Sequence, residues 1–113
     1  MNFRKITFSL IIWSVAIATV FALWKSIFLL SSALVVLALL KHKVYPLKRE
    51  LVWFIIIGIL GSSAESIVIF SGAWSYAQAQ LINVPIWLPL LWGLAGTIGV
   101  TLYQGINEPA PPK

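Results

Sequence analysis

The sequence contains no cysteine, no aspartate and one histidine, and only three of its 113 residues are acidic. The absence of cysteine excludes disulfides, thiolate metal sites and cysteine nucleophiles. The absence of aspartate excludes a Ser-His-Asp triad. The single histidine, His42, lies in a basic stretch between two apolar runs. A metal or haem site inside a membrane would therefore have few available ligands. We therefore expect no metal and no cofactor.

Charge of either sign is scarce. Charged residues make up 10% of the chain and hydrophobic residues 60%, and the mean hydropathy is +0.96. Because a soluble domain of this size needs a charged surface, this composition predicts a protein whose solvent is the lipid bilayer. The eight basic residues lie at the ends of apolar segments and form no face interleaved with aromatics, so nucleic acid is not an expected partner.

Four apolar runs predict an all-α fold, an integral membrane four-helix bundle that forms one transmembrane domain over residues 1–113. About 20 helical residues span roughly 30 Å of hydrocarbon, and the second run is the shortest of the four. The first two runs together are too long for one helix, so we expect a hairpin near Trp24, Lys25 and Ser26. Neither glycine nor proline precedes Pro46, so this turn lacks the residues that usually mark one. The expected helices are about 6–24, 26–41, 50–71 and 86–106, followed by a proline-rich tail at 108–113.

The positions of the basic residues predict the orientation. Seven bases fall on one side of the expected helices and Lys25 alone falls on the other; the seven are Arg4, Lys5, Lys41, Lys43, Lys48, Arg49 and Lys113. Since basic loops stay inside, both termini should be cytoplasmic in a multi-pass protein of the inner membrane. The N-terminus also resembles a secretory signal, but its apolar run is long and lacks a clear cleavage site, which favours an uncleaved first helix.

Glu65 is the only acidic residue inside an apolar run, Leu51 to Ser71. A carboxylate at membrane depth is costly, so it is a candidate functional acid that faces protein or water. The alternative is a structural role, in which Glu65 hydrogen-bonds across the bundle and only sets helix register. The other internal acid, Glu50, is expected near the positive end of the third helix.

An uncharged polar loop, Gly72 to Pro85, follows the Glu65 helix. Its polar and aromatic groups could line a partly wet outer pocket with Glu65 as the floor, and the candidate lining residues are Trp74, Tyr76, Gln78, Asn83 and Trp87. The alternative for the aromatic residues is a belt at the level of the lipid headgroups.

Small residues recur at helical spacing in the third and fourth runs. Gly58 and Ser62 share a face of the third helix, and Gly93, Gly96 and Gly99 lie along the fourth. Since small residues let membrane helices approach closely, we expect these two helices to form a tight pair.

The stretch from Gly58 to Leu102 has the order acid-Ser, Gly-x-Trp-x-Tyr, Pro-x-Trp-Leu-Pro-x-x-Trp. It resembles a family of small, uncharacterised bacterial inner-membrane proteins and, more faintly, membrane-embedded carotenoid hydratases, which place an acid and aromatics against an isoprenoid chain. The resemblance implies that the family positions are Glu65, Trp74, Tyr76, Pro85, Trp87, Pro89 and Trp92. In size and helix number the chain is also similar to small multidrug-resistance transporters, whose single intramembrane Glu lies in the first helix and not the third.

Three functions follow from these observations. The scarcity of reactive groups favours a non-catalytic subunit or assembly partner, working as a homodimer or in a larger membrane complex. Glu65 would also suit a proton-coupled transporter, or an enzyme that modifies a lipid or isoprenoid and binds a lipophilic ligand.

Overall fold

The computed structural model describes residues 1–109, which form four α-helices. The helices are α1 (Phe3–Leu23), α2 (Ile27–Val44), α3 (Glu50–Ile69) and α4 (Leu88–Asn107). The all-α architecture of four helices predicted from the apolar runs is therefore confirmed. Residues 110–113 of the expected proline-rich tail, including Lys113, lie outside the described residues.

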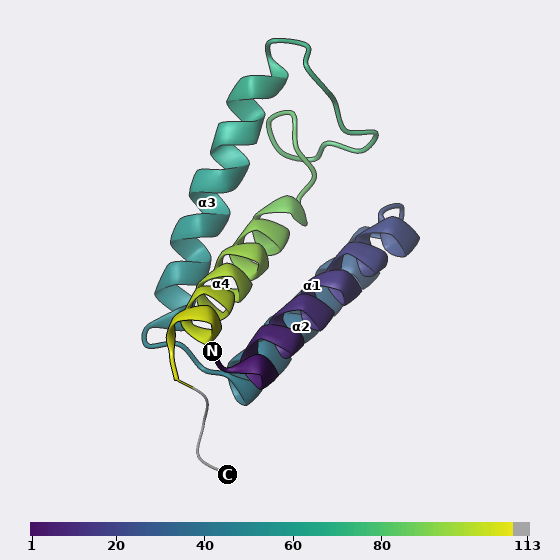
Figure 1. The fold of residues 1–113 in the computed structure, drawn as a ribbon. Coiled ribbons are helices and arrows are strands. Elements are labelled where there is room, and N and C mark those ends of the chain that lie inside the picture. The colour runs from purple at the N-terminus through teal and green to yellow at the C-terminus, as the bar shows by residue number, and fades with distance from the viewer. Residues whose placement is uncertain (110–113) are drawn as a thin grey trace.

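The start of α1, the end of α4 and the α2–α3 connection lie at one end of the molecule, which we call the basic end (Figure 1). The backbone N–H of Asn2 donates a hydrogen bond to the Gly105 carbonyl at 2.7 Å, and this ties the start of α1 to the last turn of α4. The opposite end, the loop end, holds the α1–α2 turn and the long α3–α4 loop. Because the number of helices is even, the end of α4 returns to the end of the molecule where α1 begins.

The α1–α2 hairpin turns where the sequence predicts it, between Leu23 and Ile27. The N–H of Ser26 donates to the carbonyl of Leu23 at 2.9 Å, which closes the turn without glycine or proline. The ammonium group of Lys25 lies 5.2 Å from the centre of the Trp24 ring. The cation at this end thus rests on an aromatic face, a favourable placement.

Helix α4 is the central helix, because it packs against α1, α2 and α3. Its buried residues include Thr97 and Thr101, whose hydroxyls donate to carbonyls of the same helix. Three described helices, α1, α2 and α3, are long and apolar enough to cross a membrane; α4 is not among them. The expectation of four membrane-crossing helices is therefore supported by length and composition for three of them and stays a prediction for α4. Its threonines and glycines lower its hydropathy, and its neighbours, rather than lipid, cover it.

The apolar core runs along α4 and into the end of the α3–α4 loop. Its buried members are Ile12, Ala16, Leu30, Leu34, Val84, Trp87, Leu88, Leu94 and Ile98. Large apolar side chains on the outer faces of the helices remain exposed, among them Phe21, Phe28 and Leu51. Exposed apolar side chains around most of the surface are expected where lipid replaces water as the solvent.

Candidate functional site

The carboxylate of Glu65 is held by two donors from its own chain. The Tyr76 hydroxyl donates to Oε1 at 2.5 Å, and the indole N–H of Trp92 donates to Oε2. We call these three residues the Glu65 clasp. The clasp joins α3, the α3–α4 loop and α4, so the acid faces protein.

A glycine makes room for the clasp. A Cβ at Gly61 would lie 2.2 Å from the Trp92 ring, closer than any real contact. The ring therefore lies flat against the backbone of α3, one helical turn before Glu65, and its N–H reaches the carboxylate. On the other side, the Tyr76 ring packs edge-on against Trp87, with centroids 6.1 Å apart and planes at 89°. Packing therefore holds both donor side chains in place, in addition to their hydrogen bonds to Glu65.

The Tyr76 hydroxyl is a neutral donor. Burial, and then the hydrogen bond to Glu65, raise the pKa of Tyr76 above its ordinary value. Both effects favour the protonated phenol, because a buried phenolate beside a carboxylate would place two negative charges together. The hydroxyl therefore keeps its proton and keeps donating to the acid.

Asn83 anchors the loop to α3 and does not line a pocket. Its side-chain amide donates to the Ser66 carbonyl at 3.3 Å, while the Ser66 hydroxyl donates to the Ile82 carbonyl at 2.6 Å. Its φ of 63° is left-handed, a conformation that asparagine tolerates better than most residues. These bonds fold the loop back over the end of α3.

A pocket of about 380 Å³ lies between the end of α1 and the α3–α4 loop. Three of the five predicted lining residues, Tyr76, Gln78 and Trp87, line this pocket. Trp74 and Asn83 are not among its lining residues, and their place in an outer pocket stays a prediction. Glu65 is not among its lining residues, but Tyr76, which lines the pocket, donates to the Glu65 carboxylate.

The glycines predicted to pack α3 against α4 behave in two ways. A Cβ at Gly58 would lie 2.6 Å from the Pro89 carbonyl oxygen, one at Gly93 would lie 2.7 Å from the Phe54 carbonyl oxygen, and one at Gly96 would lie 2.4 Å from Ile57. These positions let the two helices approach at backbone distance, as expected for small residues in membrane helices.

Gly99 does not take part in this packing. It is exposed, and a Cβ there would meet no atom within 4 Å. At 3.6 residues per turn, Gly96 lies about 60° around α4 from Gly93 and Gly99 about 120°, so the row has left the interface. Ser62 does lie in a buried position, and its hydroxyl has no hydrogen-bond partner among the described residues.

A second clasp, which the sequence patterns did not reveal, surrounds Glu50 at the basic end. Lys41 is fully buried and donates to Glu50 Oε2 at 3.0 Å, while His42 Nδ1 lies 2.8 Å from Oε1. The backbone N–H of Leu47 also donates to Oε1 at 3.0 Å. This Glu50 clasp joins the end of α2 to the start of α3. The only available signal was one acid directly after a stretch with four lysine and arginine residues.

The third acid, Glu108, ties the chain ends together at the surface. Its carboxylate accepts from the Asn2 side chain at 2.8 Å and from the Lys5 ammonium at 3.1 Å. The hydrogen bond from Asn2, and then that from Lys5, lower the pKa of Glu108 below its ordinary value. The basic end is therefore closed by two carboxylates, one buried and one exposed.

Metal coordination is one chemistry for which the described residues offer no site. Within residues 1–109 no cluster of three or more His, Cys, Asp or Glu side chains is placed to hold a metal ion. Comparison with protein-family models, with curated proteins and with solved structures finds no match. Inference about function therefore depends on the geometry of the chain itself.

Proposed function

We propose that this chain is a non-catalytic subunit or assembly partner in a complex of the bacterial inner membrane. One observation carries the proposal: each of the three carboxylates in the chain is bound by donors of the chain itself. Acid-base catalysis and proton coupling both need a carboxylate that can meet a substrate or a proton pathway. Here the acids serve to join helices and loops.

The proposed topology has four passes and cytoplasmic termini. Helices α1, α2 and α3 are long and apolar enough to cross, and α4 packs along α3, so a bilayer that contains α3 also contains α4. Six basic residues of the described chain gather at the basic end, whereas Lys25 is at the loop end. By the rule that positive loops remain inside, the basic end is cytoplasmic.

The resemblance to small bacterial inner-membrane proteins supports the choice of membrane. Five of the positions that carry it lie together around one contact region: Glu65, Tyr76 and Trp92 form a clasp, Trp87 packs on Tyr76, and Pro89 meets Gly58. Residues in this arrangement hold α3, the α3–α4 loop and α4 together, which suits a structural role.

Single cysteines test the topology, since the chain has none of its own. We expect a membrane-impermeant thiol reagent to label Gln78→Cys from the periplasmic side and Lys48→Cys only after the membrane is opened. Labelling with the opposite sidedness would reverse the proposed orientation. Recovery of the chain in the aqueous fraction without detergent would contradict membrane residence altogether.

The assembly role is tested by Glu65→Gln. Glutamine can accept from Trp92 through its carbonyl and donate to the Tyr76 oxygen through its amide, so both contacts survive without the charge. We expect the tagged variant to migrate in native membranes with the same larger complex as the wild type, as seen by crosslinking and native electrophoresis. A wild-type chain that migrates alone would contradict the proposal.

A proton-coupled transporter is the second candidate, and one contact favours it. Tyr76 lines the pocket at the loop end and also bonds Glu65, so it connects that pocket to the acid. In proteoliposomes with a pH gradient, loss of solute-coupled proton flux in Glu65→Gln would support transport. Lipid-modifying catalysis has no comparable contact in its favour, and turnover of added isoprenoid lipid that Glu65→Gln abolishes would support it instead.

A further inference from the structure

The helix pair α2 and α3 is open along its length. The two helices meet at the Glu50 clasp, but each packs on α4 and they form no extended contact with each other. Figure 1 shows α3 diverging from the α1–α2 hairpin away from the basic end. In a membrane the space between them faces the acyl chains, not water.

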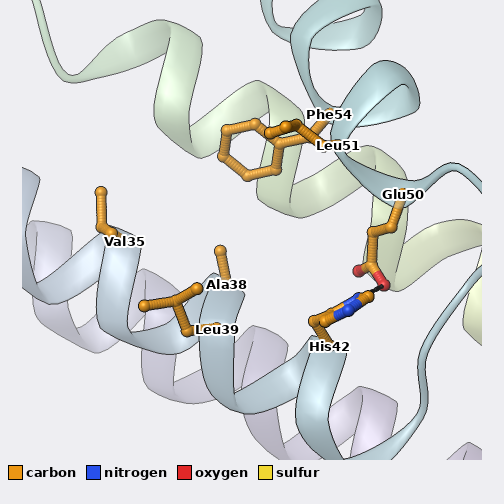
Figure 2. Close-up of a pocket in the computed structure, with 7 residues that line it drawn as sticks. All are labelled: Val35, Ala38, Leu39, His42, Glu50, Leu51 and Phe54. Carbon is orange, nitrogen blue, oxygen red and sulfur yellow. Dashed lines mark hydrogen bonds and ion pairs between the residues drawn. The ribbon is translucent and has the colours of Figure 1, made fainter.

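This space is a groove of about 390 Å³, shown in Figure 2. Its walls are apolar side chains of both helices, namely Val35, Ala38, Leu39, Leu51 and Phe54. His42 and Glu50 lie at its basic end. From Val35 to His42 the helix rises about 10 Å, so the groove reaches from headgroup level into the hydrocarbon. Its volume falls in the range of roughly 300–1,000 Å³ that is typical of small-molecule sites.

The end of the groove is positively charged. Lys41 is neutralised by Glu50, but Lys43 in the last turn of α2, and Lys48 and Arg49 in the α2–α3 connection, are exposed and have no acidic partner within residues 1–109. Lys43 follows His42 and Arg49 precedes Glu50 in the sequence, so the backbone of both exposed cations lies beside the polar end of the groove. An apolar channel with a cationic mouth is complementary to a molecule with an anionic head and a hydrocarbon tail.

We propose that the α2–α3 groove binds one anionic glycerophospholipid of the cytoplasmic leaflet, with an acyl chain between α2 and α3 and its phosphate beside Lys43 and Arg49. Basic pockets between membrane helices on the cytoplasmic side bind anionic headgroups in this way. The lipid fills a space that would otherwise leave the groove walls without contacts. The site rests on the proposed membrane location and orientation, but not on the assembly role.

The test uses the full chain in mixed micelles with phosphatidylglycerol or phosphatidylcholine of identical acyl chains, and measures bound lipid by native mass spectrometry. We expect phosphatidylglycerol to bind at least roughly tenfold more tightly, because several Lys/Arg residues near the membrane surface favour an anionic headgroup. The preference should weaken as salt is raised. Inorganic phosphate alone should compete poorly, since it cannot occupy the groove.

Paired variants separate the groove from the general lipid surface. Val35 lines the groove and Val36 does not, although both are exposed on α2. Val35→Trp should abolish tight binding and Val36→Trp should preserve it. Lys43→Gln with Arg49→Gln should remove the preference for phosphatidylglycerol, whereas Lys25→Gln at the loop end should leave it unchanged.

Three results would overturn the site: equal binding of the two lipids by the wild type, tight binding retained by Val35→Trp, or a dimer that Val35→Trp disrupts without any dependence on lipid. The last result would assign the groove to a second copy of the chain. Failure of the membrane location itself is distinct, because it would appear as protein that stays in solution without detergent.

Discussion

Two acids on the same helix are held in different ways. Glu50, at the start of α3, is bonded by the ammonium of Lys41, by His42 and by a backbone N–H. Glu65, fifteen residues later in the sequence, is bonded by the neutral donors of Tyr76 and Trp92. Each clasp fixes one connection: the Glu50 clasp fixes the α2–α3 connection and the Glu65 clasp the α3–α4 loop.

The difference follows depth. Near the chain's basic end a lysine stem can lie along apolar surface while its charge pairs with a carboxylate, so a full ion pair forms. Deeper along α3 the sequence offers no cation, and aromatic residues supply an N–H and an O–H on large apolar bodies that suit hydrocarbon. The same residue type therefore serves as an ionic tie at one end and as a hydrogen-bond acceptor at the other.

The largest expected effect comes from Glu50→Ala, which removes all the acceptors of the Glu50 clasp. It leaves the ammonium of fully buried Lys41 without its carboxylate, at a cost of about 3–5 kcal/mol in the free energy of unfolding. Chemical unfolding in detergent micelles, followed by circular dichroism, measures the loss. A loss below about 1 kcal/mol would show that Lys41 is solvated, in contrast to its burial here.

The matched control is Lys41→Met combined with Glu50→Leu. Replacing both members of a buried ion pair by apolar residues is often neutral or stabilising. We expect the double variant to recover a large part of the loss caused by Glu50→Ala. If it does not, the contacts of Glu50 with His42 and with the Leu47 N–H, and not the charge pair with Lys41, dominate this end.

Next in size is Gly61→Ala, which acts on the Glu65 clasp through packing. The new Cβ would meet the Trp92 ring at 2.2 Å, so the indole must move away from both α3 and Glu65. We expect a loss of about 1–3 kcal/mol, typical of an overpacked core, together with a shift in tryptophan fluorescence. Gly99→Ala is the control: its site is open, and alanine should stabilise the helix by up to about 1 kcal/mol. Equal losses in the two variants would contradict close packing at Gly61.

Glu65→Leu and Glu65→Gln separate polarity from charge. Leucine leaves the Tyr76 hydroxyl and the Trp92 N–H without an acceptor, which should cost about 1–3 kcal/mol. Glutamine keeps a partner for each and should cost less than half as much. Adding Tyr76→Phe to Glu65→Leu should cost little more, because the hydroxyl is already unpaired. Fully additive losses in this double-mutant cycle would show that Tyr76 and Glu65 do not interact.

The smallest effect concerns Glu108, the exposed counterpart of the two clasps. Its pKa is lowered in the folded chain, so it favours the fold above the ordinary carboxyl pKa of about 4.3. That contribution is lost as the pH falls below about 4.3 and through the lowered folded value. The wild type should therefore exceed Glu108→Gln in unfolding midpoint at neutral pH, and the difference should vanish in acid. A difference that does not shrink as the pH is lowered from neutral into acid would contradict stabilisation of the Glu108 carboxylate by Asn2 and Lys5.

Much of the candidate site follows from the sequence because the bilayer limits the choices. Glu65 is expected to face protein or water whatever the fold, and the spacing of Gly58, Gly93 and Gly96 predicts which two helices approach closely. Gly99 does not pack against α3, because each step of three residues turns about 60° around the helix, and from Gly93 to Gly99 two such steps carry the position out of the interface. Polarity alone cannot distinguish a loop side chain that lines the pocket, such as Gln78, from one that bonds a backbone group, such as Asn83.

The Glu50 clasp and the α2–α3 groove were beyond sequence reasoning for a related reason. A basic stretch between helices is explained by orientation alone, so the burial of Lys41 has no separate signal in the pattern. The groove exists only because α4 packs against both α2 and α3, and pairing between elements distant in sequence is not encoded in local periodicity.

The sequence by itself determined that the chain is helical, that four apolar runs supply the helices, and that Glu65 must face protein or water. Hydropathy and helical spacing are local properties, and the cost of a charge in hydrocarbon does not depend on the fold. Only the tertiary structure decided that the partners are Tyr76 and Trp92, that α4 is central, and that α2 and α3 stand apart. Those outcomes depend on which faces meet, and this is set by the joint packing of side chains that lie far apart along the chain.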